Sequence, residues 1–186
     1  MRAFVYGGAA CGKSAFAEEL CCGRAGQVLY VATMERGGAD AEARIERHRR
    51  LRAGKGFSVL ECPRCLASAA IPAADVALVE DAGNLVANEL FAGGATGDHD
   101  LDADRAARRV LAGIEHLALC VRDLVVVSVD VARDGVGYDE GTQAYLKALA
   151  QVNAELAIAS DCAVEVVCGL PVWLRGCEEL WKEGAR

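Results

Sequence analysis

The 186-residue sequence is 53% hydrophobic and 25% charged, and its formal net charge is −7. This composition is typical of a globular protein, and the length fits one domain over residues 1–186. The negative charge excludes general nucleic-acid binding, which needs a basic surface. No apolar run approaches the length of a membrane span and no secretory signal is visible, so we expect a cytoplasmic protein.

The nine cysteines are scattered along the chain. In a protein without a secretory signal, we expect them to be reduced and to serve as small apolar residues rather than as a disulfide framework. Cys62 and Cys65 form a single C-x-x-C, with no second pair and no histidine nearby. A zinc or redox role for this pair is therefore not favoured.

The first twenty residues contain the most specific motif. Residues 2–6 are a short β-type run, residues 7–14 read GGAACGKS, and helix-favouring residues follow. The motif G-x-x-x-x-G-K-S between a strand and a helix is a phosphate-binding P-loop, in which main-chain N–H groups and the helix N-terminus hold phosphate oxygens. Lysine reaches the outer phosphates and serine binds Mg²⁺. The predicted phosphate-binding residues are Gly7, Gly8, Ala9, Ala10, Cys11, Gly12, Lys13 and Ser14.

The remaining sequence alternates between strand-like and helix-like segments. Apolar, β-branched runs predict strands, and longer runs of helix-forming residues without Gly or Pro predict helices. This alternation predicts an α/β fold with a mostly parallel sheet flanked by helices. The predicted strands are 27–32, 57–61, 76–79, 124–129 and 162–168; the helices are 39–52, 83–91, 101–122 and 141–160, and a tail from residue 170 ends in a short helix.

Acidic residues follow two of the predicted strands. Glu80 and Asp81 come after residues 76–79, and Asp130 follows residues 124–129. Ligands bind at the carboxyl ends of parallel strands, where the P-loop and Thr33 are also expected. A P-loop protein needs an acid to complete the Mg²⁺ shell, so Glu80, Asp81 and Asp130 are candidate metal ligands together with Ser14. The alternative is that each is a helix N-cap or a solvated strand end.

A second candidate site is the arginine-rich segment around His48. Arg44, His48 and Arg52 are spaced four apart and share one face of the predicted helix. Neighbouring arginines disfavour protonation of the imidazole and attract a triphosphate, which suits a histidine that attacks the α-phosphate of a nucleotide. The alternative is a solvated, charge-rich helix face. His99 and His116, in a loop and a long helix, are interpreted as structural.

Taken together, these motifs resemble the bifunctional adenosylcobinamide kinase/adenosylcobinamide-phosphate guanylyltransferase family of cobalamin biosynthesis. The resemblance extends over nearly the whole chain. It rests on the P-loop, on LYVAT at 29–33, RI-x-x-HR at 44–49 with Arg52, Glu61, LVE at 78–80 with Asn88, VN at 152–153 and CGLP at 168–171.

The resemblance implies a RecA-like P-loop fold, a homotrimer with sites at subunit interfaces, and two activities. Lys13 and Ser14 would serve phosphoryl transfer to a hydroxyl of adenosylcobinamide, with Mg²⁺ and GTP or ATP. His48 would carry GMP before its transfer to the phosphorylated corrinoid. By resemblance, the nucleotide-binding residues beyond the P-loop are Thr33, Arg49, Arg52, Glu61 and Glu80.

The sequence departs from the family pattern in three places. Ala10-Cys11 replaces Arg-Ser in the P-loop, residues 129–132 read VDVA rather than NEVG, and Leu146-Lys147 replaces Arg-Asp. Two alternatives therefore stay open. One is a P-loop kinase with another small-molecule acceptor, and the other is a nucleotide-binding regulatory protein that has lost turnover.

Overall fold

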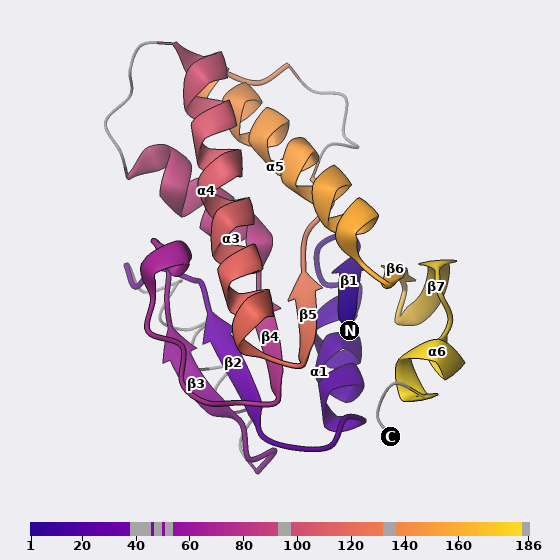
Figure 1. Cartoon of the computed structure of the whole chain (residues 1–186). Coiled ribbons are helices and arrows are strands. Elements are labelled where there is room, and N and C mark those ends of the chain that lie inside the picture. The colour runs from indigo at the N-terminus through magenta and orange to yellow at the C-terminus, as the bar shows by residue number, and fades with distance from the viewer. Residues whose placement is uncertain (38–45, 47–49, 51–53, 93–97, 132–136, 184–186) are drawn as a thin grey trace.

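The computed structural model describes residues 1–37, 46, 50, 54–92, 98–131 and 137–183. These residues build one seven-stranded sheet in the order β3-β2-β4-β5-β1-β6-β7 (Figure 1). All neighbouring strands are parallel except β7, which is antiparallel to β6. The strands are β1 (Arg2–Tyr6), β2 (Val28–Ala32), β3 (Ser58–Glu61), β4 (Val76–Glu80), β5 (Asp123–Val127), β6 (Cys162–Val167) and β7 (Leu170–Arg175).

Helices cover both faces of this sheet. Figure 1 shows α3, α4 and α5 packed together on one face, whereas α1 packs on the other. The predicted helix over 39–52 lies outside the described residues except for Glu46 and Arg50, which are both helical. The described helices are α1 (Lys13–Cys22), the 3-10 helix η1 (Leu66–Ser68), α3 (Ala82–Phe91), α4 (His99–Cys120), α5 (Glu140–Ala159) and α6 (Glu178–Glu183).

The apolar strands explain why the sheet is buried on both faces. Successive side chains of a strand point to opposite faces, so a parallel strand between two helical layers must be apolar throughout. In β1, Phe4 packs toward α3, α4 and α5, whereas Ala3 and Val5 pack toward α1. The predicted fold class, an α/β sheet of mostly parallel strands flanked by helices, is confirmed.

The chain after residue 170 differs from the expected irregular tail with a terminal helix. It forms β7 before α6, because Cys168 and Gly169 make a tight turn with φ values of 51° and 81°. Positive φ at both central residues is typical of the type I′ hairpin turn. Pro171 obscured this strand in the sequence, but proline is tolerated in an edge strand such as β7, where one side of the ladder is unpaired.

Two smaller expectations also need correction. His99 is the first residue of α4 rather than a loop residue, because Asp98 caps the helix by accepting a hydrogen bond from Leu101 N at 3.0 Å. Only three cysteines are buried as small apolar residues, namely Cys21, Cys62 and Cys162, whereas five are exposed. Within the described part of the chain, no helix has both the length and the apolar character needed to cross a bilayer.

A buried ionic cluster closes the amino-terminal edge of the sheet. Asp123, the first residue of β5, pairs with buried Arg24 and accepts a second hydrogen bond from Arg24 Nε at 2.9 Å. The Arg24 guanidinium also stacks 4.7 Å from the ring centre of Trp181 in α6. Burial acts to raise the pKa of Asp123, but hydrogen bonds from Arg24 and Arg122 outweigh it and lower the pKa below its ordinary value. This carboxylate is therefore fully compensated.

Candidate active site

The P-loop connects β1 to α1 as the sequence predicts. Gly12 has φ 98° and precedes the first residue of the helix, Lys13. A Cβ at Gly12 would lie 3.2 Å from the Cα of Gly169, so glycine is required both by conformation and by space. The Lys13 side chain is largely buried, and its Nζ donates a hydrogen bond to the Gly8 carbonyl at 3.1 Å. The ammonium group therefore lies over the phosphate-binding loop.

Ser14 and Glu80 meet beside this loop. The Ser14 hydroxyl donates to Glu80 Oε1 at 2.6 Å, which connects the start of α1 to the end of β4. The other oxygen, Glu80 Oε2, is buried and has no hydrogen-bond partner among the described residues. Burial raises the pKa of Glu80 to about 7, and this effect exceeds the opposing effect of the Ser14 hydrogen bond. A buried carboxylate oxygen without a partner, next to a serine hydroxyl, fits the oxygen ligands that Mg²⁺ prefers.

The other two acidic candidates have different surroundings. Asp81 is the N-cap of α3, and its Oδ1 accepts a hydrogen bond from Asn84 N at 2.8 Å; its role as a metal ligand stays a prediction. The main-chain N–H of Asp130 donates to the Gly7 carbonyl at 3.0 Å, which places Asp130 beside the P-loop. Among the described residues, no group of three or more His, Cys, Asp or Glu side chains could hold a metal ion by itself. Any metal site here would need the serine hydroxyl or the nucleotide as well.

Thr33 holds the end of β4 in position. It is fully buried, and its hydroxyl lies 2.7 Å from the Glu80 carbonyl and 2.9 Å from that of Asp81. The Asn88 amide donates to the Thr33 carbonyl and to the Pro63 carbonyl, both at 2.8 Å. These contacts fix the backbone that carries Glu80. The contact of Thr33 with nucleotide stays a prediction, because its side chain is engaged by protein atoms.

The structure does not bring every predicted residue to the P-loop. Glu61 ends the edge strand β3, four strand spacings or roughly 19 Å from β1. It pairs with Arg36, whose Nη2 lies 2.7 Å from Glu61 Oε1 and 2.8 Å from Oε2. The nucleotide contact of Glu61 stays a prediction. His48, Arg49 and Arg52 lie outside the described residues.

The β6–β7 turn packs beside the site, and sequence reasoning did not predict this contact. The Gly169 N–H donates to the Cys11 carbonyl at 2.8 Å, so the turn packs directly on the P-loop. Residues 168–171 were noted only as part of the family resemblance, and Cys168-Gly169 is a weaker turn pattern than Asn-Gly or Asp-Gly. Ser128 adds a second unpredicted contact, since its hydroxyl donates to Asn153 Oδ1 at 2.6 Å and so connects the end of β5 to α5.

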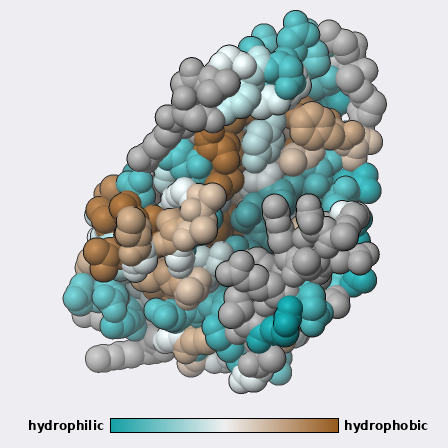
Figure 2. All heavy atoms as spheres, turned by 180° about the vertical axis from the view of Figure 1, so that it is seen from behind, coloured by the Kyte–Doolittle hydropathy of each residue, from teal (hydrophilic) through white to brown (hydrophobic). Residues whose placement is uncertain are grey.

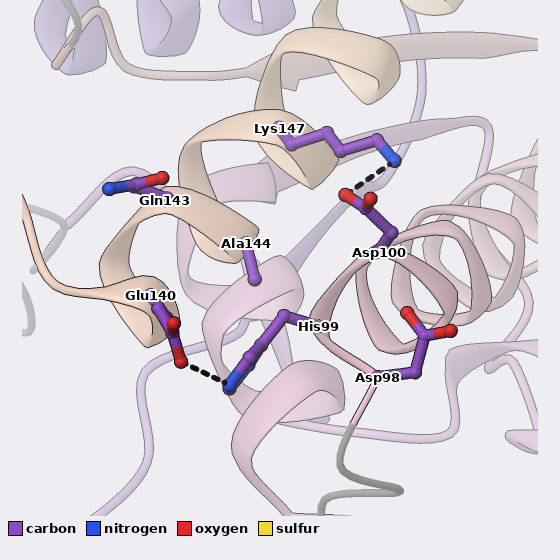
Figure 3. Close-up of a pocket in the computed structure, with 7 residues that line it drawn as sticks. All are labelled: Asp98, His99, Asp100, Glu140, Gln143, Ala144 and Lys147. Carbon is purple, nitrogen blue, oxygen red and sulfur yellow. Dashed lines mark hydrogen bonds and ion pairs between the residues drawn. The ribbon is translucent and has the colours of Figure 1, made fainter.

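A separate polar cavity of about 550 Å³ lies between the first turns of α4 and α5. Figure 3 shows its charged side chains joined across the cavity. Lys147, at one of the positions that depart from the family, lies 3.0 Å from Asp100, and His99 lies 3.3 Å from Glu140. Exposed pairs of this kind contribute little to stability. The cavity therefore indicates local helix packing rather than chemistry.

The sheet order, the P-loop and the Ser14–Glu80 contact together define a P-loop nucleotide-binding α/β protein. A solved type III secretion system ATPase from pathogenic bacteria has the same fold. The two align with a TM-score of 0.58 and 12% sequence identity over 99% of this chain and 61% of the ATPase chain. At this identity, the comparison supports the fold alone.

The sequence comparisons are more specific. Residues 3–174 match the family described as cobinamide kinase / cobinamide phosphate guanyltransferase. The chain is 33% identical to the bifunctional adenosylcobalamin biosynthesis protein CobU of Salmonella typhimurium, covering 94% of this chain and all of that protein. It is 32% identical to the corresponding Escherichia coli protein, again over 94% of this chain and all of that protein. The chain belongs to this family of transferases.

Proposed function

We propose that the protein phosphorylates adenosylcobinamide and transfers GMP from GTP to the phosphorylated product through a guanylyl-histidine at His48. The observation that carries the proposal is the Ser14–Glu80 pair at the P-loop, in a chain that matches the cobinamide family over residues 3–174. Homologues of this kind use a nucleoside triphosphate, and the P-loop supplies its phosphate site.

The described residues suit phosphoryl transfer. The N-terminus of α1 and the P-loop amides neutralise phosphate charge, and Lys13 adds a full positive charge within reach of the outer phosphates. Ser14 and Glu80 would hold Mg²⁺, with Asp130 close by. When bound, Mg²⁺ neutralises charge that develops on the transferred phosphoryl group. Buried Glu80 would supply a carboxylate oxygen, Oε2, that has no hydrogen-bond partner among the described residues.

The guanylyl-transfer half is tested by labelling. Incubation with [α-³²P]GTP and Mg²⁺ is expected to label the protein through an acid-labile, alkali-stable phosphoramidate bond, because His48 displaces pyrophosphate. His48→Ala should abolish labelling, whereas the matched control His116→Ala should retain it. The imidazole of His116 lies 3.1 Å from the Ala69 carbonyl and has a structural contact. Equal labelling of wild type and His48→Ala would overturn this half of the proposal.

The kinase half is tested with adenosylcobinamide as acceptor. Lys13→Ala should abolish corrinoid phosphorylation with either ATP or GTP. The matched control is Lys182→Ala, because Lys182 is an exposed lysine of α6 that pairs with Glu178. Comparing the two nucleotides in the wild-type protein would also establish the phosphate donor, which the sequence leaves open.

The departures in the P-loop and after β5 favour a second candidate, a kinase with another small-molecule acceptor. Ala10-Cys11 removes an arginine and a hydroxyl beside the phosphates, and residues 129–132 lack the amide and glycine of the family pattern. If wild type is labelled by GTP but phosphorylates no corrinoid, this candidate is supported. Tight nucleotide binding without any turnover would instead support a regulatory protein.

We also propose a homotrimer, as the family resemblance implies, in the cytoplasmic location expected from the sequence. Leu170, Val172 and Leu174 alternate along β7, and their exposed fractions are 69%, 46% and 64%. Figure 2 shows apolar surface gathered on the side of the molecule where β7 lies. Exposed apolar patches of this kind often mark subunit contacts. Light scattering should give a trimer mass for wild type and a smaller mass for Leu174→Asp.

A further inference from the structure

Two cysteines meet where the β6–β7 turn packs on the P-loop. Cys11 is in the centre of the P-loop, and Cys168 is the first central residue of the turn. The residue after Cys168, Gly169, donates its N–H to the Cys11 carbonyl at 2.8 Å. The Cα of Gly169 also lies against Gly12, where a Cβ would be only 3.2 Å away. The two segments are therefore in main-chain contact.

This contact brings the two thiols within reach of each other. The bond lengths on either side of this hydrogen bond keep the Cα atoms of Cys11 and Cys168 within roughly 8 Å of each other, close to the roughly 4.4 to 6.8 Å that disulfides span. A Cβ at Gly7 would lie 2.8 Å from the Cys11 sulfur and 2.7 Å from the Val166 carbonyl oxygen. The Cys11 sulfur therefore lies beside the end of β6, two residues before Cys168.

The exposure of both thiols distinguishes Cys11 and Cys168 from the other pairs of neighbouring cysteines, in each of which one thiol is buried. Cys11 is half-buried and Cys168 is exposed, so both thiols can be reached by a small oxidant. In the C-x-x-C pair, Cys62 is buried, and burial raises the pKa of its thiol. The same holds for Cys162 beside Cys177, and for Cys21 beside Cys22. Thiols that are kept protonated by burial react slowly.

We propose that Cys11 and Cys168 form a reversible disulfide that locks the P-loop to the β6–β7 turn. A hydroperoxide is the oxidant. One thiolate attacks the O–O bond, which gives a sulfenic acid and releases the other oxygen as water or an alcohol. The second thiol then attacks the sulfenic sulfur, and water leaves as the S–S bond forms. The two cysteines together lose two protons and two electrons, and the hydroperoxide is reduced.

The cross-link would control nucleotide binding. P-loop amides hold phosphates only when successive N–H groups converge on one point. Bonding to Cys168 draws the Cys11 side chain away from Gly7 and fixes the centre of the loop to the turn. The loop then loses the freedom to close around phosphates. This consequence rests on the proposed role of the P-loop, whereas formation of the disulfide does not.

The test is oxidation of the reduced full-length protein with a small excess of hydrogen peroxide, followed by alkylation of the remaining thiols and peptide mapping without reductant. The expected result is a linked peptide pair containing Cys11 and Cys168, with a mass loss of two hydrogens. Binding of a fluorescent GTP analogue should weaken at least tenfold and recover with dithiothreitol. Cys168→Ser should form no such link and should keep its nucleotide affinity after peroxide.

The matched control is Cys120→Ser, since Cys120 is an exposed thiol at the end of α4 that has no cysteine partner in this proposal. This variant should behave like wild type. Absence of the linked pair overturns the proposal, as does loss of binding in oxidised Cys168→Ser to the same degree as in wild type. A linked protein that binds the GTP analogue normally overturns the regulatory consequence. If the reduced protein binds no nucleotide, the proposed function fails, and the linked peptide still decides the cysteine assignment.

Discussion

Glu80 and Asp123 are buried carboxyl groups at opposite ends of the parallel strands: Glu80 lies at the carboxyl-terminal end and Asp123 at the amino-terminal end. Their surroundings differ. Asp123 opens β5 and is held by Arg24 and Arg122, which lower its pKa despite burial. Glu80 ends β4, and among the described residues its carboxyl group is bonded only by the Ser14 hydroxyl; burial raises the pKa of this carboxyl group to about 7. At the amino-terminal end, the charge of the Asp123 carboxylate is balanced by arginines of the same chain, and this pairing supports folding. At the other end, Glu80 Oε2 has no hydrogen-bond partner among the described residues, although the charge of Lys13 acts to lower the pKa of this carboxyl group, and this is the arrangement expected of a site that binds a further cation.

The largest expected effect is on activity. Glu80→Gln keeps the shape of the side chain but removes the charge, so we expect corrinoid phosphorylation to fall about 100-fold or more. The same variant should be more stable than wild type at pH 8. The raised pKa corresponds to a charge-burial cost on the order of 3 kcal/mol. Urea unfolding at pH 8 without nucleotide measures the stability, and a coupled assay of nucleoside diphosphate release measures the activity. If Glu80→Gln is as active as wild type and less stable, the contrast drawn between Glu80 and Asp123 is wrong.

The next effect is on stability. Asp123→Ala leaves the buried guanidinium of Arg24 without its carboxylate, and removing one partner of a buried ion pair typically costs about 3–5 kcal/mol. Urea unfolding at pH 7 should show this loss directly. Nucleotide affinity of the fraction that stays folded should be unchanged, because Asp123 lies at the amino-terminal edge. A large loss of affinity at unchanged stability would show that the two edges are not independent.

Glu80 and Asp123 should change the free energy of unfolding in opposite directions as the pH rises. The folded-state pKa of Glu80 lies above its unfolded value, so its unfavourable effect is absent below about pH 4.5 and grows as pH rises toward 7. The folded-state pKa of Asp123 lies below its unfolded value, so its stabilising effect is present above about pH 4 and is lost as pH falls further. Wild type should therefore lose stability between pH 5 and 8 relative to Glu80→Gln. Parallel stability curves for the two proteins would refute this.

The smallest effect concerns the exposed pair at the edge strand β3. Removing Arg36, as in Arg36→Ala, should change the free energy of unfolding by less than about 1 kcal/mol, because both side chains are largely exposed. Glu61→Gln should have an equally small effect on stability. If Glu61 contacts nucleotide as the resemblance implies, only Glu61→Gln should reduce labelling by GTP. Equal labelling of the two variants would remove Glu61 from the site.

Local sequence was sufficient for the parts of the fold that depend on periodicity and on the P-loop motif. The apolar runs located β1 to β6 to within a few residues, and GGAACGKS located the start of α1. Sequence did not separate the roles of adjacent acids. Glu80 is the last residue of β4 and Asp81 follows it, yet the first contacts Ser14 and the second caps α3, because the direction of each side chain depends on the packing of α1 and α3.

Longer-range contacts were not predictable for a different reason. The contact of Gly169 with Cys11 joins segments more than 150 residues apart, and nothing in either segment indicates the other. The strand β7 was missed because its exposed residues and Pro171 weaken the usual strand pattern. The arginine-rich segment around His48 lies outside the described residues except for Glu46 and Arg50, so the role of His48 stays a prediction.

The most direct test of the comparison is the titration of the Glu80 carboxyl group itself. Carboxyl ¹³C NMR of protein labelled at glutamate, with Glu80→Gln to assign the resonance, should give a midpoint near pH 7 without ligand. Addition of Mg²⁺ and a non-hydrolysable nucleotide should move that midpoint below pH 5, because a bound cation favours the charged form. A Glu80 midpoint near the ordinary value of about 4.5 in both conditions would contradict the account.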